Sequence, residues 1–61
     1  MTAQLKAQQM VENHGIVESI NRCKKILSVV HEHLELDPTE ANSSLFQFWG
    51  DVMDFLLTLV A

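Results

Sequence analysis

The single proline of this 61-residue chain, Pro38, separates its two most regular apolar segments. Proline disfavours helical geometry at the residue before it, so a helix that approaches Asp37 should end near Glu35. Pro38 itself suits the first position of a new helix, with Asp37 as its N-cap and Glu40 placed to complete a capping box. Because the connection is short, the two helices should pack antiparallel as an αα-hairpin. The sequence predicts a helix over 16–35, a turn at 36–37 and a helix over 38–60.

The segment before the proline has the apolar spacing of a helix that packs along one seam. Successive members are four, three, four, three and four residues apart, which is the a/d pattern of a heptad repeat. Cys23 lies within this seam, where a free cysteine behaves as a small hydrophobe, and one cysteine excludes an internal disulfide. The predicted intrachain core of this helix consists of Ile16, Ile20, Cys23, Leu27, Val30 and Leu34.

The segment after the proline repeats this spacing but is apolar around far more of its circumference. Flanking residues widen its apolar arc to roughly 200°, whereas a helix with one antiparallel neighbour needs little more than about 100°. The core residues predicted for this helix are Leu45, Val52, Leu56 and Leu59. The extra width predicts a surface that one hairpin cannot bury, which we interpret as a dimer or partner interface. Its residues are Phe46, Trp49, Met53, Leu57 and Val60.

Two occupants could cover this apolar surface. A contiguous exposed apolar patch marks an interface or promotes aggregation. A chain of this size gains barely enough from its own core to fold and is commonly stabilised by oligomerisation. We therefore expect a homodimer in which two hairpins form a four-helix-type bundle. A groove for an apolar helix of another protein is the alternative, and one assembly can provide both.

The first fifteen residues show a weaker pattern. Gln9 and Asn13 occupy positions in line with the seam of the following helix, and Gly15 costs about 1 kcal/mol inside a helix. We expect residues 1–15 to form a weakly packed N-terminal helical arm, with packing on a second subunit as the alternative. The whole chain, residues 1–61, is expected to be one small all-α domain.

No pattern for catalysis or cofactor binding is found. His31 and His33 are two residues apart, so on a helix they point about 200° away from each other and cannot share a metal ion. His31 and Glu35 could share one, but two ligands do not make a structural zinc site. No histidine lies three or four residues from Cys23 to activate it, and no phosphate loop or Ser-His-Asp pattern occurs. We expect no enzymatic activity, no cofactor and no metal.

Eight acidic residues against four basic ones give a net charge of −4, which disfavours binding to polyanions. The basic cluster Arg22, Lys24 and Lys25 supports the alternative of a small helical nucleic-acid-binding regulator. The polar face of the second helix carries Asp51 and Asp54 and no basic residue, the reverse of a membrane-surface helix. The sequence begins with no recognisable secretory signal and has one free thiol, so we expect a cytoplasmic protein that does not bind membranes.

With Leu36-Asp37 followed by Glu40 at the loop, the chain resembles the Rop-type plasmid copy-number regulators in length and predicted architecture. That resemblance implies two hairpins paired in a four-helix bundle. The wide, aromatic-rich second helix departs from the family's pattern, so its RNA-binding activity is not carried over. The function we expect is that of a small acidic homodimeric regulator that binds another protein, as bacterial, plasmid or phage accessory proteins do.

Overall fold

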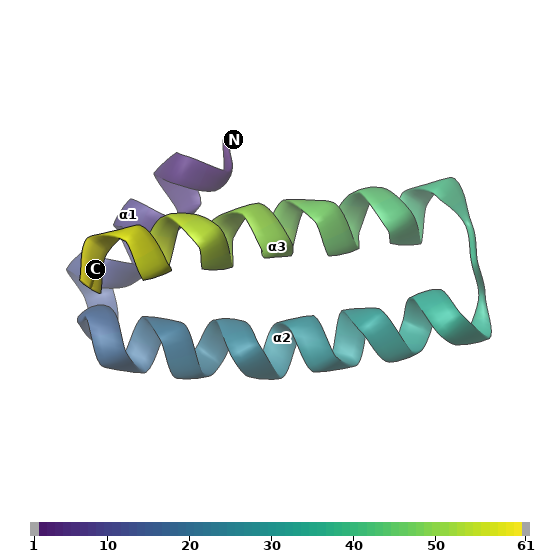
Figure 1. The fold of residues 1–61 in the computed structure, drawn as a ribbon, viewed down its shortest axis with the longest axis horizontal. Helices are drawn as coiled ribbons and strands as arrows, with labels where there is room; N and C mark the ends of the chain where they lie inside the picture. Colours follow the sequence, from purple (N-terminus) through teal and green to yellow (C-terminus); the bar gives the residue numbers. More distant parts are fainter. Residues whose placement is uncertain (1, 61) are drawn as a thin grey trace.

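The computed structural model describes residues 2–60 and folds them into three α-helices, without a strand in that range. In chain order these are α1 (Ala3–His14), α2 (Ile16–Leu36) and α3 (Glu40–Val60). The long helices α2 and α3 lie side by side as an antiparallel hairpin, and α1 packs against both at the end where α2 begins and α3 finishes (Figure 1). The predicted all-α class is confirmed. The predicted domain also includes Met1 and Ala61, which lie outside the described residues.

The turn between α2 and α3 is built differently from the predicted capping box. α2 continues to Leu36, and Asp37 is its C-cap, with φ −143° and ψ 85°, a non-helical geometry expected before Pro38. Thr39 takes the N-cap role instead, because its hydroxyl accepts the backbone N–H of Asn42 at 3.1 Å. The side-chain amide of Asn42 also donates to the Asp37 carbonyl at 2.8 Å. The turn therefore begins one residue later than predicted and spans three residues.

α1 is a packed third helix, so the prediction of a weakly packed arm was wrong. Ala7 is fully buried and Met10 is only 6 % exposed. Both belong to one core cluster with Cys23 of α2 and with Val52 and Leu56 of α3, and these three side chains are fully buried. The core of the protein is thus made by three helices, not two.

Gly15 explains why α1 is packed more closely than the sequence pattern predicted. Its backbone has φ 79° and ψ 167°, a region that is essentially restricted to glycine. It ends α1, with its N–H donating to the Val11 carbonyl at 2.8 Å, and it starts α2, where the Ser19 hydroxyl donates to the Gly15 carbonyl at 2.6 Å. Ser19 is fully buried at this junction. Because Gly15 interrupts the helix, the side chains of α1 do not follow the phase of α2, on which the prediction depended.

The residues predicted as intrachain core fall into three groups. Four are buried: Cys23, Val30, Val52 and Leu56. Four are partly buried: Ile16, Ile20, Leu27 and Leu34. The other two, Leu45 and Leu59, are 46 % and 51 % exposed, which the prediction did not foresee. Leu45 lies in the first turns of α3, far from α1, and Leu59 lies in the last turn, where less of the chain surrounds it.

Candidate interaction surface

α1 covers one side of α3 and leaves the other side open. Phe55 and Leu59 of α3 line a shallow groove together with Val11 and neighbouring polar residues of α1. α1 therefore lies on the Phe55 side of α3. Leu57 is two residues further along the helix, so it points about 200° away from Phe55. A helix packed on the Phe55 side cannot also cover Leu57.

The open side of α3 carries four of the five residues predicted as the interface. We name Phe46, Met53, Leu57 and Val60 the Met53 strip. Leu57 and Val60 are 47 % and 54 % exposed, whereas Phe46 and Met53 are partly buried within their own chain. The single chain thus covers one part of the strip and leaves its C-terminal part open to solvent.

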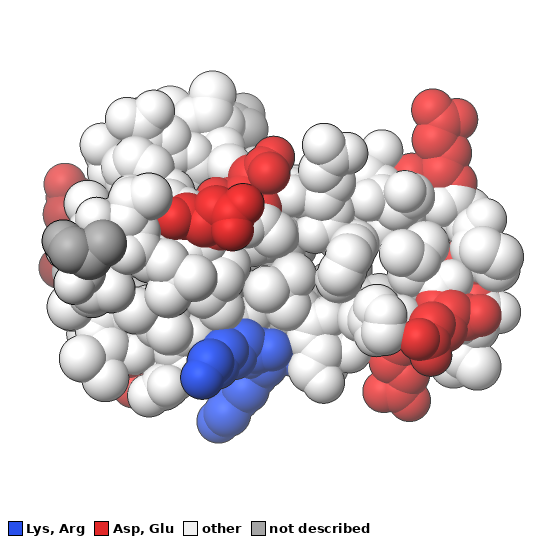
Figure 2. Space-filling model, in the orientation of Figure 1, with Lys and Arg blue, Asp and Glu red and all other residues white. Residues whose placement is uncertain are grey.

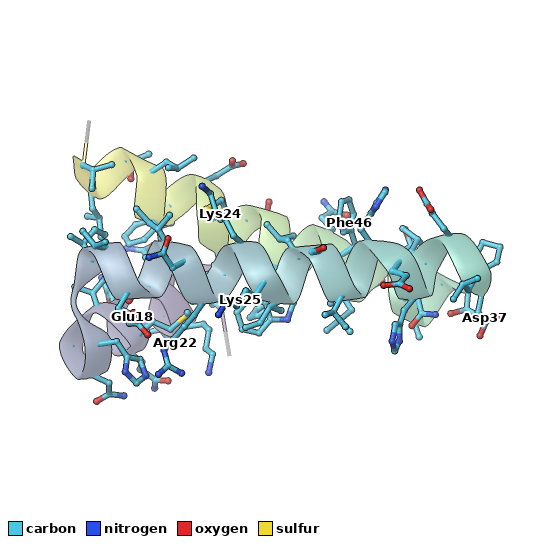
Figure 3. All side chains as sticks on the ribbon, turned by 90° about the horizontal axis from the view of Figure 1, so that it is seen from below. Glu18, Arg22, Lys24, Lys25, Asp37 and Phe46 are labelled. Atoms are coloured by element: carbon cyan, nitrogen blue, oxygen red, sulfur yellow. The ribbon has the colours of Figure 1, made fainter. Side chains whose placement is uncertain are left out.

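α2 supplies the neighbours of the strip. The ring of His31 packs against Phe46 with 5.4 Å between ring centroids. Lys24 lies on the same side of the molecule as Phe46 (Figure 3). Val17 precedes Lys24 by seven residues and shares its side of α2, and it is 68 % exposed. The face therefore combines the strip with Val17 at one end and with His31 at the other.

Charge is distributed unevenly over this face. Figure 2 shows the molecule from the side on which most of α1 is hidden, with uncharged side chains over most of the surface. Acidic side chains lie at the end that contains the turn and in a second group over α3, and a basic group lies at the edge formed by α2. The acidic residues near the turn are Glu32, Glu35, Asp37 and Glu40. The apolar strip therefore ends in an acidic rim on the turn side.

Trp49, the fifth predicted interface residue, is held between the helices instead. It lines a pocket with Met10 of α1 and Ile26 of α2, and the Lys6 ammonium lies 5.9 Å from the centroid of its ring. Its ring meets Phe48 edge-on, with 5.5 Å between centroids. The structure thus separates Trp49 from the exposed part of the Met53 strip.

The three basic residues of α2 do not form a single patch. Lys24 lies on the Phe46 side and Arg22 on the opposite side, whereas Lys25 lies between them and lines a pocket with Arg22 and residues of α1 (Figure 3). Arg22 is also paired with Glu18, with 3.1 Å between Nε and Oε1. A nucleic acid that contacted Lys24 would therefore face away from Arg22, which points about 200° from Lys24 around α2.

Cys23 is buried, and it is the only cysteine of the chain. Removal from water raises the pKa of its thiol, because burial penalises the charged thiolate. The sulfur lies 3.5 Å from the Trp49 carbonyl oxygen, to which the thiol donates. A neutral thiol enclosed by apolar side chains is a packing group and a poor nucleophile.

The histidine, cysteine and acidic side chains of residues 2–60 are spread over the three helices and the turn. No group of three or more histidine, cysteine, aspartate or glutamate side chains in that range is placed to hold a metal ion. His31 and Glu35 form only a pair, with 3.3 Å between Nε2 and Oε1. None of the helices between those limits combines the length and apolar character that crossing a bilayer requires.

The fold and the open face define a small three-helix protein with an apolar surface along its last helix. No family model, curated protein or solved structure matches the chain. The resemblance to the Rop-type regulators is therefore one of predicted architecture alone, and the function has to be inferred from the residues themselves.

Proposed function

We propose that this protein is a non-enzymatic interaction module that forms a homodimer through the Met53 strip and acts as a small regulator of another protein. The observation that carries the proposal is the open end of the strip. Leu57 and Val60 are about half exposed there, and Val17 of α2 is more exposed still. Burying the exposed part of each side chain is worth on the order of 1 kcal/mol.

A two-fold symmetric dimer uses such a surface efficiently. The same patch is buried on both chains, so each apolar contact occurs twice. The strip lies along α3, so two copies can place their α3 helices side by side and bury Leu57, Val60 and Met53 together. Oligomerisation also supplies stability that a chain of this size gains only with difficulty from its own core.

The acidic rim indicates which other protein the surface favours. The apolar strip ends near Glu35, Asp37 and Glu40, whose charges favour partners that carry basic residues. An amphipathic helix with an apolar face and a basic end would meet both features. We propose that such a partner binds the turn end of the Met53 strip, which the dimer leaves free.

Sedimentation equilibrium of two matched variants tests the dimer. Val60→Asp and Val29→Asp introduce the same charge at valines that are both 54 % exposed. Val29 lies beside Lys25 and Ile26, on the side of α2 away from the strip. We expect a wild-type dimer at micromolar concentration, a dimer weakened by about tenfold or more in Val60→Asp, and little change in Val29→Asp.

Two outcomes would overturn the proposal. One is a folded wild-type monomer at micromolar concentration. The other is a Val29→Asp variant that dissociates as much as Val60→Asp does, which would move the interface to the α1 side. Circular dichroism of both variants checks that any loss of the dimer does not come from loss of helix.

A further inference from the structure

A second feature lies on the other side of the molecule, where α1 crosses the hairpin. A pocket of about 490 Å³ opens there between the three helices. This volume falls within the usual range for small-molecule sites, roughly 300–1,000 Å³. The pocket faces away from the Met53 strip, because its walls include residues of α1 and Arg22, which lies on the α1 side of α2 (Figure 3).

The charge of this pocket is opposite to that of the protein. Three of the four Lys and Arg residues of the chain line it, namely Lys6, Arg22 and Lys25, together with His14. Among the eight acidic residues only Glu18 does so. With histidine neutral, three cations and one carboxylate give a local charge of +2, which leaves −6 for the rest of a chain whose total is −4.

The remaining wall of the pocket is apolar. Met10, Ile26 and Trp49 form it, and the Lys6 ammonium lies over the Trp49 ring, 5.9 Å from its centroid. The face of an aromatic ring and several cationic groups therefore border the same small space. Such a site can hold the apolar or planar body of a ligand while the cations hold its negative charge.

We propose that this pocket binds a small organic anion that has a planar apolar body and a carboxylate or phosphate group. The planar body lies against Trp49, and the anionic group lies between Lys6 and Lys25. Arg22 contributes through the N–H groups that its Glu18 partner leaves free, since a guanidinium has five donors. The proposal does not depend on the dimer, because the pocket lies on the opposite side from the strip.

The size of the positive region favours a small ligand over a polymer. The described molecule measures 32 × 20 × 20 Å, so the basic pocket is only part of one side. Beyond it the net charge is strongly negative, and at physiological salt charges act over about 8 Å. A long polyanion would leave the pocket and meet this negative surface, whereas an anion of pocket size would not.

Trp49 provides a direct readout, because it is the only tryptophan of the chain. Phenyl phosphate and benzoate serve as probes of the two anionic groups, and phenol is the uncharged control. We expect a saturable change in tryptophan fluorescence with a Kd of about 1 mM or tighter for at least one anion, and binding of phenol that is weaker by about tenfold or more. The tighter of the two anions identifies the preferred group.

Two neighbouring lysines give a matched pair of variants. Lys25→Gln and Lys24→Gln remove the same charge from adjacent positions of α2, but only Lys25 lines the pocket. We expect Lys25→Gln to weaken binding of the preferred anion by about fivefold or more and Lys24→Gln by less than about twofold. Val60→Asp should bind as wild type does, which separates failure of this site from failure of the proposed dimer.

Three results would overturn the inference. The first is wild-type fluorescence that does not saturate with either anion. The second is binding of phenol as tight as that of the anions, which would make the pocket merely apolar. The third is equal loss in Lys24→Gln and Lys25→Gln. If a single-stranded oligonucleotide then binds with steep salt dependence and involves both lysines, a nucleic-acid surface replaces the small-anion site.

Discussion

The two halves of the hairpin differ in how much core they contain. We name residues 3–24 and 49–60 the α1 half, and residues 25–48 the turn half. The α1 half contains the buried residues Ala7, Met10, Ser19, Cys23, Val52 and Leu56. Within the described chain, Val30 is the one buried side chain of the turn half, and it is 8 % exposed. The two halves contain the same pair of helices, so the difference comes from α1.

The length of α1 sets this division. α1 has 12 residues, or about 18 Å of helix, and it crosses one end of α2, which has 21 residues and is roughly 31 Å long (Figure 1). Where the third helix is present, side chains between α2 and α3 are closed off from water. Where it is absent, two helices alone leave one flank of each apolar seam open, as at Leu45 and Val29. A pair of long helices is therefore insufficient to make a closed core in this chain.

The largest expected effect comes from matched leucines of α3, one in each half. Leu56 is fully buried and Leu45 is 46 % exposed. Leu56→Ala should lower the free energy of unfolding by about 2–5 kcal/mol, because it removes buried surface and leaves a cavity. Leu45→Ala should lower it by less than about 1 kcal/mol, because much of that side chain already contacts water. Urea denaturation followed by circular dichroism measures both, and equal losses would contradict the division into two halves.

The junction that positions α1 can be tested with the two glycines. Gly15→Ala should lower the free energy of unfolding by about 1–3 kcal/mol, because an L side chain is strained at φ 79° and ψ 167°. Gly50→Ala should raise it by about 0.5–1 kcal/mol, because alanine is favoured within a helix. A Cβ meets no atom within 4 Å at either position, so the backbone alone sets the two signs. Stabilisation by Gly15→Ala, measured in the same urea titration, would show that the junction does not require glycine.

The pH dependence of stability reports on the core of the α1 half. Burial raises the pKa of the Cys23 thiol, so the folded protein keeps a proton that the unfolded chain loses above about pH 8.5. The free energy of unfolding should therefore fall as the pH rises from there toward the folded pKa, by at most about 1.4 kcal/mol per pH unit. Below that window Cys23 contributes no pH dependence.

Cys23→Ala provides the control for this prediction, because it removes the thiol and leaves every other titrating group in place. The difference between the two proteins isolates the contribution of Cys23. Thermal unfolding at several alkaline pH values measures it. Parallel pH profiles for the two proteins would mean that the thiol does not become more acidic on unfolding.

The turn half depends more on local hydrogen bonds than on burial. Thr39→Ala removes the oxygen that accepts the Asn42 backbone N–H, and it should lower the free energy of unfolding by about 1 kcal/mol. Asp37→Ala leaves that bond and the Asp37 carbonyl intact, so we expect a smaller loss. Chemical denaturation of the two variants compares them directly. A larger loss of unfolding free energy in Asp37→Ala would indicate that Asp37 caps α3, as the sequence predicted.

The regular parts of the sequence predicted α2 and α3 well. The proline and the heptad spacing placed their boundaries within about two residues, and Cys23, Val30, Val52 and Leu56 are buried as expected. These predictions succeed because helical spacing fixes which side chains share a face. The heptad spacing does not determine how far along the seam a third helix extends. That extent decides whether Leu45 is exposed.

The sequence of α1 does contain a pattern that indicates its packing. Ala3, Ala7 and Met10 are four and three residues apart, which is the spacing of a narrow apolar seam on a helix. This seam becomes visible only when α1 is given its own phase, independent of α2, because Gly15 interrupts the helix. No comparable spacing in the sequence predicts the basic pocket. Lys6 and Lys25 are far apart in sequence, and only the crossing of α1 brings them to one space.

Isotope-filtered NMR of a mixed sample, with labelled and unlabelled chains, tests most directly whether the strip joins two copies. Nuclear Overhauser effects between chains are observed only for protons that lie close across an interface. We expect them at the Met53 methyl group and at the methyl groups of Leu57 and Val60, and not at Val29. Contacts between chains that involve Val29 and spare Met53 would contradict the account, as would a sample that is monomeric at the concentrations used.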